Sequence, residues 1–322
     1  MIVVTGGAGF IGSNIVRALN ESGYDDILIV DNLGKDEKYK NLIGLKFSDY
    51  IHCDDFLEYV INANFNESDI EVIFHEGACS DTMEYNVNYM IKTNYEYSKA
   101  LLNFCVESDI EFIYASSAST YGGGENGFSE NEKCENALNP YAFSKLLFDN
   151  YVRKNLAEIE SKVIGLRYFN VFGPQEFHKG RMASIAYQMY NQIKTTGVIK
   201  LFKGTDGYED GEQKRDFIYV KDVAKVNLWC WQNGIYNGVY NCGTGKATTF
   251  NALAQAVISA MGKGEIKYID FPETLKGKYQ SFTQADTRKI LRAGYDGGFT
   301  EINDAVKEYC EFLEDGGYYE KN

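Results

Sequence analysis

The sequence predicts an α/β protein built on a doubly wound parallel sheet, with a smaller mixed α/β domain for a substrate. Three observations lead to this fold class. Short, wholly apolar runs recur through the first half of the 322-residue chain, as in strands buried on both faces of a parallel sheet. Segments with helical periodicity separate these runs. A glycine-rich turn, residues 6–12, joins the first apolar run to the first helical segment.

The first unit of the chain has the form strand, glycine turn, helix. Residues 2–5 form the apolar run, and a periodic helix follows from about Phe10 to Glu21. In this context a GxGxxG pattern predicts a Rossmann-type dinucleotide site, because backbone N–H groups at the helix N-terminus can approach a pyrophosphate. We therefore expect Gly6, Gly9 and Gly12 to bind a cofactor.

The second apolar run, residues 27–30, ends at Asp31, 19 residues after Gly12. A carboxylate at this spacing bonds the ribose 2′-hydroxyl of NAD. However, Lys35 and Lys38 follow closely, and a cation there could hold the 2′-phosphate of NADP. The residues alone leave both cofactors open.

Further strands and helices continue the alternation. Strands are expected at 49–52, 72–75, 112–115, 163–168 and 239–243, and helices at 83–107, 223–231 and 250–261. Asn94 lies inside the first of these helices and could bond loops near the cofactor. The small residues that follow the strand 72–75 fit the close approach of a cofactor, and His75 at its end is expected to be structural.

The candidate chemistry centres on Tyr141 and Lys145, which lie four residues apart and so share one face of a predicted helix. An unperturbed tyrosine has a pKa near ~10. A nearby lysine and a positively charged cofactor ring would both favour the phenolate. A cluster of hydroxyl residues, 116–120, follows the strand 112–115, where ligands bind in this architecture.

The pattern changes after Pro174, and this change predicts two domains. Residues 1–171 are expected to form the NAD(P)-binding domain, to which 217–245 return. Residues 172–216 and 246–322 are expected to form the substrate-binding domain. Two basic, glycine-containing loops, 178–182 and 276–279, lie in this second part and stand out in an acidic protein.

Composition excludes several classes of partner. The net charge of −14 and the pI of about 4.8 argue against nucleic acid and anionic membranes. Seven cysteines without a CxxC pair predict reduced thiols, and three histidines without ligand spacing predict no metal site. No apolar run approaches the ~18 residues of a membrane span, and no signal peptide is evident, so we expect a cytoplasmic protein.

These motifs together resemble the extended short-chain dehydrogenase/reductase superfamily. The motifs are the glycine turn 5–12, the serines 116–117, Tyr141-xxx-Lys145, and the segment 215–224. Within it, the chain is similar nearly end to end to the ADP-L-glycero-D-manno-heptose 6-epimerase family. The segments that carry this closer resemblance are 31–33, 75–80, 115–117, 168–171, 173–174, 178–180, 182–184, 214–216, 275–279 and 282–286.

The resemblance implies an isomerase that interconverts ADP-D-glycero-β-D-manno-heptose and ADP-L-glycero-β-D-manno-heptose for the lipopolysaccharide core. The reaction oxidises C6″ transiently and returns the hydride to the opposite face. The resemblance implies that Tyr141 is the first base and Lys179 the second. Ser117 would bond the reacting oxygen, and Lys145 would hold the nicotinamide ribose and lower the pKa of Tyr141.

The resemblance also implies the remaining ligands and a homo-oligomer. The cofactor, NADP with NAD possible, would contact Phe10, Ile11, Asp31, Asn32, Lys38, Glu76, Gly77, Ala78, Cys79, Ser80, Asn94, Lys145, Val171 and Lys179. The ADP-sugar would contact Asn170, Phe202, Lys203, Gly204, Thr205, Arg215 and Tyr279. The chain departs from the family pattern at Cys53, where relatives have a lysine for NADP, and at the substrate positions Arg181 and Gln188.

Three alternatives remain from the same residues. A nucleotide-sugar 4-epimerase would have no evident need for Lys179. A 4,6-dehydratase needs an acidic pair beside the active-site serine, whereas Ser117 is followed by Ala118, Ser119 and Thr120. A non-catalytic NAD(P)-binding protein would have no reason to keep Ser117, Tyr141 and Lys145 in register.

Overall fold

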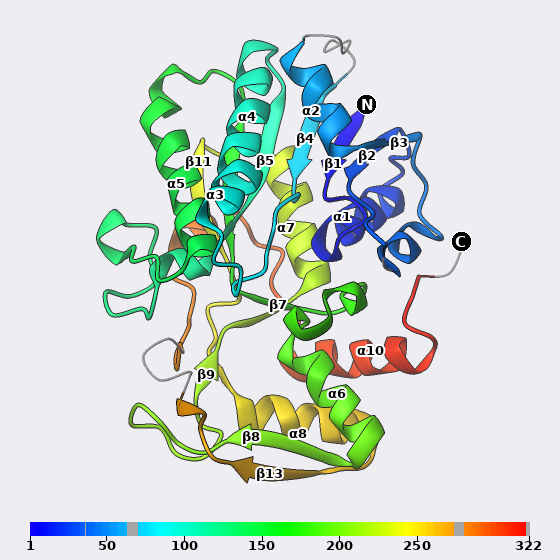
Figure 1. The fold of residues 1–322 in the computed structure, drawn as a ribbon, viewed down its shortest axis with the longest axis vertical. Helices are drawn as coiled ribbons and strands as arrows, with labels where there is room; N and C mark the ends of the chain where they lie inside the picture. Colours follow the sequence, from blue (N-terminus) through cyan, green and yellow to red (C-terminus); the bar gives the residue numbers. More distant parts are fainter. Residues whose placement is uncertain (36, 63–69, 274–279, 320–322) are drawn as a thin grey trace.

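The central element is a seven-stranded, wholly parallel sheet (Figure 1). The computed structural model describes residues 1–35, 37–62, 70–273 and 280–319. The strand order is β11-β6-β5-β4-β1-β2-β3, so the order reverses between β1 and β4, where Rossmann-type sheets bind their ligands. The strands are β1 (Ile2–Thr5), β2 (Ile27–Asp31), β3 (Asp49–His52), β4 (Val72–His75), β5 (Glu111–Ser117), β6 (Val163–Tyr168) and β11 (Gly238–Cys242). The predicted fold class is confirmed.

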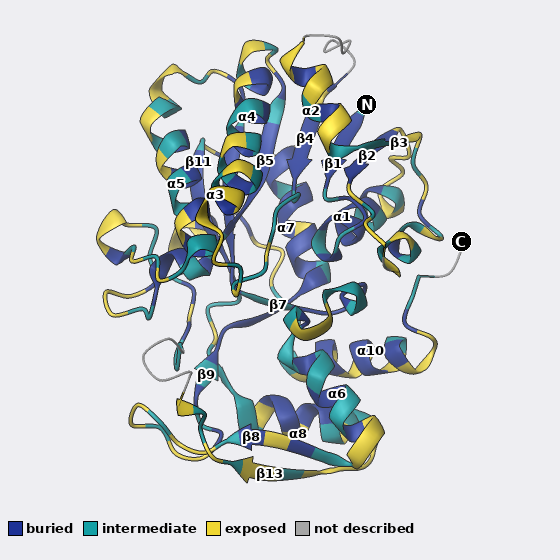
Figure 2. Cartoon of the chain, in the orientation of Figure 1, coloured by how far each residue is buried: buried dark blue, intermediate teal, exposed yellow. Residues whose placement is uncertain are grey.

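Helices cover both faces of this sheet (Figure 1). Alternate residues of one strand enter different cores, with Val4 packing among α1 and α7 and Val3 among α2, α4 and α5. The sheet is therefore buried on both sides except at the edge strand β3, as Figure 2 shows by the dark colour of the other strands. The bounds of these helices are α1 (Phe10–Glu21), α2 (Cys53–Ile61), α4 (Tyr97–Glu107), α5 (Pro140–Asn155) and α7 (Val220–Gln232).

A second hydrophobic core lies below the sheet in Figure 1. It contains Met189, Leu253 and Val306 from three different helices. Its elements are α6 (Ile185–Thr196), α8 (Phe250–Met261), α10 (Ile302–Glu314) and the parallel pair β8 (Val198–Phe202) and β13 (Glu265–Ile269). Two short pairs lie between this core and the sheet, β7 (Asn170–Phe172) with β10 (Phe217–Tyr219) and β9 (Lys214–Arg215) with β12 (Thr248–Thr249).

The expected single helix 83–107 is wrong in its first part. The structure has α3 (Val87–Met90), a π-helical turn, η3 (Ile91–Glu96), and then α4. Side chains satisfy the backbone before residue 87: the Asp81 carboxylate accepts from Met83 N (2.8 Å) and the Glu84 carboxylate from Asn86 N (2.6 Å). Such local bonds compete with helix formation. π-Helical turns occur frequently at functional sites, and this one carries Asn94.

Thiols and membrane spans can be assessed from the same structure. All seven cysteines are free thiols, and burial raises the pKa of Cys105 and Cys242 well above the ordinary value, which keeps these two thiols protonated. Within the described ranges, none of the helices has the length and apolar character that a bilayer crossing requires.

Candidate active site

The glycine turn is shaped so tightly that side chains do not fit. Gly6 has a positive φ of 66°, and a Cβ there would lie 2.7 Å from Gly77 N on the neighbouring loop after β4. A Cβ at Gly12 would overlap the Gly6 carbonyl oxygen. The N-cap of α1, Gly9, supplies no side-chain cap, so the first N–H groups of the helix can receive a phosphate. The turn therefore fits a dinucleotide pyrophosphate.

The carboxylate of Asp31 lies at the end of β2 beside the glycine turn. It accepts hydrogen bonds from Ala8 N (2.9 Å) and Asn32 N (2.7 Å), and it forms an ion pair with Lys38 (2.5 Å). Asp31, which favours NAD, and Lys38, which could hold the 2′-phosphate of NADP, thus lie in direct contact. Lys38 can neutralise Asp31 or turn to a 2′-phosphate, so this geometry is compatible with NAD and NADP.

Three consecutive residues at the start of α2 could in principle bind a metal. His52, Cys53 and Asp54 each place a ligand atom within 4.8 Å of the other two. However, His52 Nδ1 accepts from Asp54 N (3.3 Å) and so caps α2, and burial raises the pKa of the Cys53 thiol. The structure explains the trio as a helix start.

Asn94 fixes the loop after β4. Its side chain accepts from Cys79 N (2.8 Å), donates to Cys79 O (2.9 Å), and donates to Ser144 Oγ (3.1 Å) on α5. The loop 76–80 is thereby tied to the helix that carries Tyr141. His75, at the end of β4, is buried between Thr5 Oγ1 (2.6 Å) and Ser98 Oγ (2.8 Å), and burial lowers its pKa to about 3. It is neutral and structural.

Glu76, in the loop after β4, contacts β6 through its carboxyl group. It accepts from Tyr168 Oη (2.7 Å), and that hydroxyl accepts from Asn227 Nδ2 (2.9 Å). Burial raises the pKa of Glu76 to about 7, although Tyr168 and the Lys145 ammonium oppose this shift. Near neutral pH this residue can therefore change charge beside the Tyr141–Lys145 pair.

Helix α5 presents Tyr141 and Lys145 at the carboxyl end of β5. Asn139 caps the helix by accepting from Ala142 N (2.8 Å), and Pro140 occupies its first turn, where proline is well tolerated. Lys145 is buried, and its Nζ donates to Ala115 O (2.8 Å). Burial lowers the pKa of Lys145 to about 8, against the opposing effects of Glu76 and Asp149.

Burial, and not Lys145, has the largest effect on the pKa of Tyr141 in this structure. Burial raises the pKa of Tyr141 above its ordinary value, and the charge of Glu76 adds to this rise. The interaction that lowers it comes from Ser117, while the Lys145 ammonium is directed at Ala115 O. Ser117 itself accepts hydrogen bonds from Ser119 N (3.2 Å) and Ser119 Oγ (2.9 Å).

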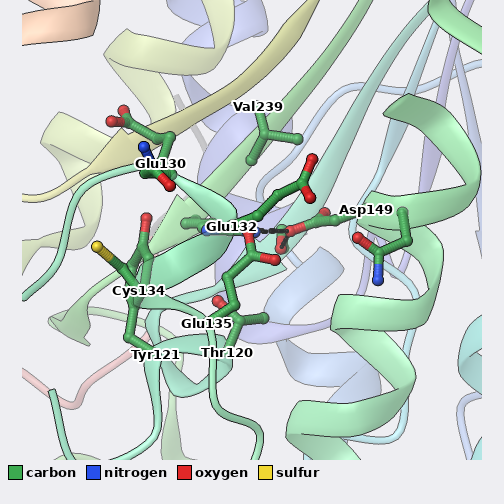
Figure 3. Close-up of polar contacts among 12 residues, drawn as sticks. Thr120, Tyr121, Glu130, Glu132, Cys134, Glu135, Asp149 and Val239 are labelled. Atoms are coloured by element: carbon green, nitrogen blue, oxygen red, sulfur yellow. Dashed lines mark hydrogen bonds and ion pairs between the residues drawn. The ribbon is translucent and has the colours of Figure 1, made fainter. Parts of the chain in front are cut away.

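A buried ion-pair cluster supports this part of the site from behind. Arg167 on β6 donates through Nε (2.9 Å) and Nη2 (2.8 Å) to Asp149 on α5, and Nη2 also donates to Glu135 (2.5 Å). Glu135 and Asp149 reach this point from the loop before α5 and from α5 itself (Figure 3). Asp149 also accepts from Ser116 Oγ (2.8 Å), next to Ser117, so the cluster fixes β5 against α5.

A cavity of about 670 Å³ lies between the sheet and the second core. Residues named from the sequence line it from many elements: Ser80, Tyr141, Asn170, Val171, Lys179, Gln188, Phe202 and Arg215. The lining also includes residues that the sequence did not indicate: Thr82, Met182, Gln192, Lys200, Phe250 and Ile269. Arg215 lies with its guanidinium carbon 5.9 Å from the centre of the Phe250 ring, so a cation and an aromatic face share one wall.

Lys179 enters this cavity from η7 (Phe177–Met182). Its Nζ lies 5.3 Å from the centre of the Phe10 ring at the start of α1, within the range of a cation–π contact. Burial lowers the pKa of Lys179, and the Glu176 carboxylate partly opposes this. An ammonium with a lowered pKa in a cavity can exchange a proton at lower pH than a surface lysine.

Some predicted substrate residues do not line the cavity within the described part of the chain. Arg181 is exposed and pairs with Asp81 (3.1 Å), and Lys203 pairs with Asp270 (2.8 Å). Gly204 is exposed and Thr205 half-buried in the segment after β8, and the structure does not bring these four residues to the cavity. Tyr279 lies outside the described residues.

The sequence matches the NAD dependent epimerase/dehydratase family over residues 2–243, and the Rossmann-type sheet agrees with this match. The chain belongs to this family. It is similar to an ADP-L-glycero-D-manno-heptose-6-epimerase from Helicobacter pylori, at 31% identity and a TM-score of 0.83, covering 97% of this chain and 96% of that one.

Two further solved structures are nearly as similar. One is a UDP-N-acetylglucosamine 4-epimerase from Methanobrevibacter ruminantium in complex with UDP-N-acetylmuramic acid, at 26% identity, a TM-score of 0.81 and 98% coverage of both chains. The other is a UDP-glucose 4-epimerase from Thermotoga maritima with UDP-glucose, at 27% identity and a TM-score of 0.80, covering 98% of this chain and 99% of that chain. The substrate therefore has to be argued from the site.

Proposed function

We propose that the protein is an ADP-L-glycero-D-manno-heptose 6-epimerase. The observation that carries this proposal is that two candidate acid–base residues, Tyr141 and Lys179, line the same cavity from different elements. When only the terminal carbon of the bound sugar turns between the two hydride transfers, its oxygen exchanges protons in two positions. Two bases in one cavity would meet that need, whereas a sugar that turns over as a whole can return its oxygen to a single tyrosine.

The roles of the residues follow from this arrangement. A bound nicotinamide cofactor supplies reversible hydride transfer at C6″. Tyr141 takes the hydroxyl proton in one orientation of the terminal carbon, and Lys179 exchanges the proton in the other. Ser117 donates to the reacting oxygen, and Lys145 binds the nicotinamide ribose.

We propose that the nucleotide occupies the wall formed by Arg215, Phe202 and Phe250. A guanidinium can pair bidentately with a diphosphate, and aromatic rings can pack against a base. For the cofactor we propose NADP, with NAD as the alternative, because Lys38 can hold a 2′-phosphate beside Asp31. The proposal also includes a cofactor domain of residues 1–171 and 217–245, a substrate domain of residues 172–216 and 246–322, and a homo-oligomeric assembly.

A second candidate function is UDP-sugar 4-epimerisation. It is favoured by the close TM-scores of the two UDP-sugar epimerases, 0.81 and 0.80. Such an enzyme has no evident use for Lys179. Replacement of Lys179 by alanine therefore separates the two candidates, because the 4-epimerase would keep its turnover.

Proton NMR of purified protein with ADP-D-glycero-D-manno-heptose tests the function. We expect conversion to the L-glycero epimer with retained cofactor or after addition of NADP or NAD. UDP-glucose and UDP-N-acetylglucosamine serve as parallel substrates under the same conditions. Conversion of a UDP-sugar without conversion of the heptose would reject the proposal in favour of the second candidate.

A further inference from the structure

The loop that carries Lys179, residues 173–184, is organised around one buried carboxylate. Glu176 is 0% exposed. It accepts hydrogen bonds from Gly173 N (3.3 Å) at the start of the loop and from both Ser184 N and Ser184 Oγ (2.7 Å) at its end. A buried carboxylate is costly unless its oxygens are bonded, so these bonds hold the two ends of the loop together.

A further donor comes from the far end of the sequence. Tyr309, buried on α10, donates its hydroxyl to Glu176 Oε1 (2.8 Å). Phe177, the next residue of the loop, packs against Tyr187 of α6 with ring centres 5.4 Å apart, and against Tyr318 at 5.0 Å. The loop is therefore fastened to the second hydrophobic core.

The other side of the loop is connected by hydrogen bonds to the glycine turn, residues 6–12, and to α1. Asn41 Nδ2 donates to Gln175 O (3.0 Å) and to Ala8 O (3.0 Å), and Asn14 Nδ2 donates to Pro174 O (3.0 Å). These bonds connect the segment just before Glu176 to the glycine turn and to α1. Lys179 then extends over the ring of Phe10 within this frame.

The donors require Glu176 to act as an acceptor. An ionised carboxylate only accepts hydrogen bonds, whereas a protonated one has an O–H that would oppose a donor. Burial raises the pKa of Glu176, but the Ser184 and Tyr309 donors and the Lys179 charge oppose this shift. In return, the Glu176 charge raises the pKa of Lys179 against the effect of burial.

Resting on the proposed function, in which Lys179 is the second acid–base residue, we propose that Glu176 is a positioning residue for Lys179. Its carboxylate closes the loop 173–184 and, through Tyr309, fixes the ammonium in the cavity. Glu176 is not among the described residues that line the cavity. It therefore acts through the loop and its charge, without touching the substrate.

The test measures the pH titration of the Lys179 side chain by NMR and needs neither substrate nor turnover. Lysines of the whole protein are reductively methylated with ¹³C, and the signal of Lys179 is assigned by its loss in Lys179→Arg. In Glu176→Gln we expect the titration midpoint of Lys179 to move to lower pH, because a negative charge is removed. Tyr309→Phe should move it in the same direction by less, because loss of the Tyr309 hydroxyl loosens the position of the Glu176 charge relative to the Lys179 ammonium.

A matched control is available on the neighbouring helix. Tyr190 also donates its hydroxyl to a glutamate, Glu314 (2.6 Å), but lies outside the cavity lining and the Lys179 loop. Tyr190→Phe should leave the midpoint of Lys179 unchanged. If Glu176→Gln does not fold, Tyr309→Phe decides the matter. A Lys179 midpoint that matches the wild type in the folded loop variants overturns the proposal.

Kinetics then separate this inference from the proposed function. With the heptose substrate, Glu176→Gln should lower kcat by roughly 10- to 100-fold, the scale expected when a catalytic group is displaced by about 1 Å, while KM changes little. Unchanged turnover in Lys179→Ala would contradict the two-base function and leave the titration result standing. An inactive Lys179→Ala together with an unmoved Lys179 midpoint in Glu176→Gln would overturn only the role of Glu176.

Discussion

The buried ion pair behind the active site makes a strong prediction about stability. In the variant Asp149→Asn, the Arg167 guanidinium keeps its place but loses the carboxylate that accepts from its Nε and Nη2. Both side chains are 0% exposed, so water cannot replace the lost charge. The remaining partner of Arg167, Glu135, is shared with Arg153.

The magnitude follows from this burial. Breaking a buried pair by removing one partner costs about 3–5 kcal/mol, because an uncompensated charge stays in the interior. Ser116 and Tyr114, which also donate to Asp149, lose part of their acceptor as well. Since a domain is stable by only about 5–15 kcal/mol in total, we expect a large fall in the unfolding free energy.

Urea denaturation at pH 7 measures the effect, with Glu21→Gln as the control. Glu21 pairs with Arg17 at 2.7 Å on the surface of α1 and is 60% exposed. An exposed helical pair of this kind contributes about 0.3–0.5 kcal/mol. If Asp149→Asn cost no more than this control, the account of the cluster as a structural support of β5 and α5 would be refuted.

Three other variants test the site. Tyr141→Phe should lower turnover by roughly 10²–10⁴ while cofactor fluorescence titrations stay unchanged, and unaltered turnover would remove Tyr141 from the chemistry. Gly12→Ala should weaken cofactor binding by at least about tenfold in the same titration, because its Cβ overlaps the Gly6 carbonyl oxygen; full affinity would contradict the tight turn. Glu76→Gln tests the pKa of Glu76, which is about 7 in the folded protein and 4.5 as the ordinary value. Because the unfolded chain ionises first, the unfolding free energy of the wild type falls as pH rises from 4.5 to 7, by about 3 kcal/mol in total. The variant lacks this loss, so its unfolding free energy in urea should rise relative to that of the wild type between pH 5 and pH 8. A difference that does not change with pH would contradict the raised pKa of Glu76.

Local patterns were sufficient to predict much of the fold. The helices 10–21 and 250–261 begin and end in the structure where apolar periodicity placed them. The strand 72–75 also matches, because a buried parallel strand is a continuous apolar run, and the predicted strand 49–52 forms the less buried edge of the sheet. These features depend on neighbours in the sequence, which a single chain displays.

Features that depend on distant contacts were missed. Nothing local shows that residues 198–202 pair in parallel with 265–269, or that Phe202 and Ile269 then line one cavity wall. The start of the helix at 87 was missed because side chains of Asp81 and Glu84 bond the preceding backbone, which periodicity does not report.

The candidate site likewise contains residues that local spacing could predict and contacts that it could not. Tyr141 and Lys145 could be paired from their spacing, since one helix carries both. The contact of Lys179 with Phe10, and the support of its loop by Tyr309, join residues more than a hundred positions apart. Only the fold reveals them. The pKa of Tyr141 could not be predicted from spacing either, because it depends on burial and on Glu76 in the loop after β4.

The central claim is that the enzyme epimerises C6″ by moving a hydride out and back. The most direct measurement is proton and deuterium NMR of ADP-heptose epimerisation in D₂O. The account predicts full conversion with no deuterium at C6″, because the carbon-bound hydrogen is returned without exchange with solvent. Deuterium incorporated at C6″ would show proton abstraction at carbon and would contradict the account.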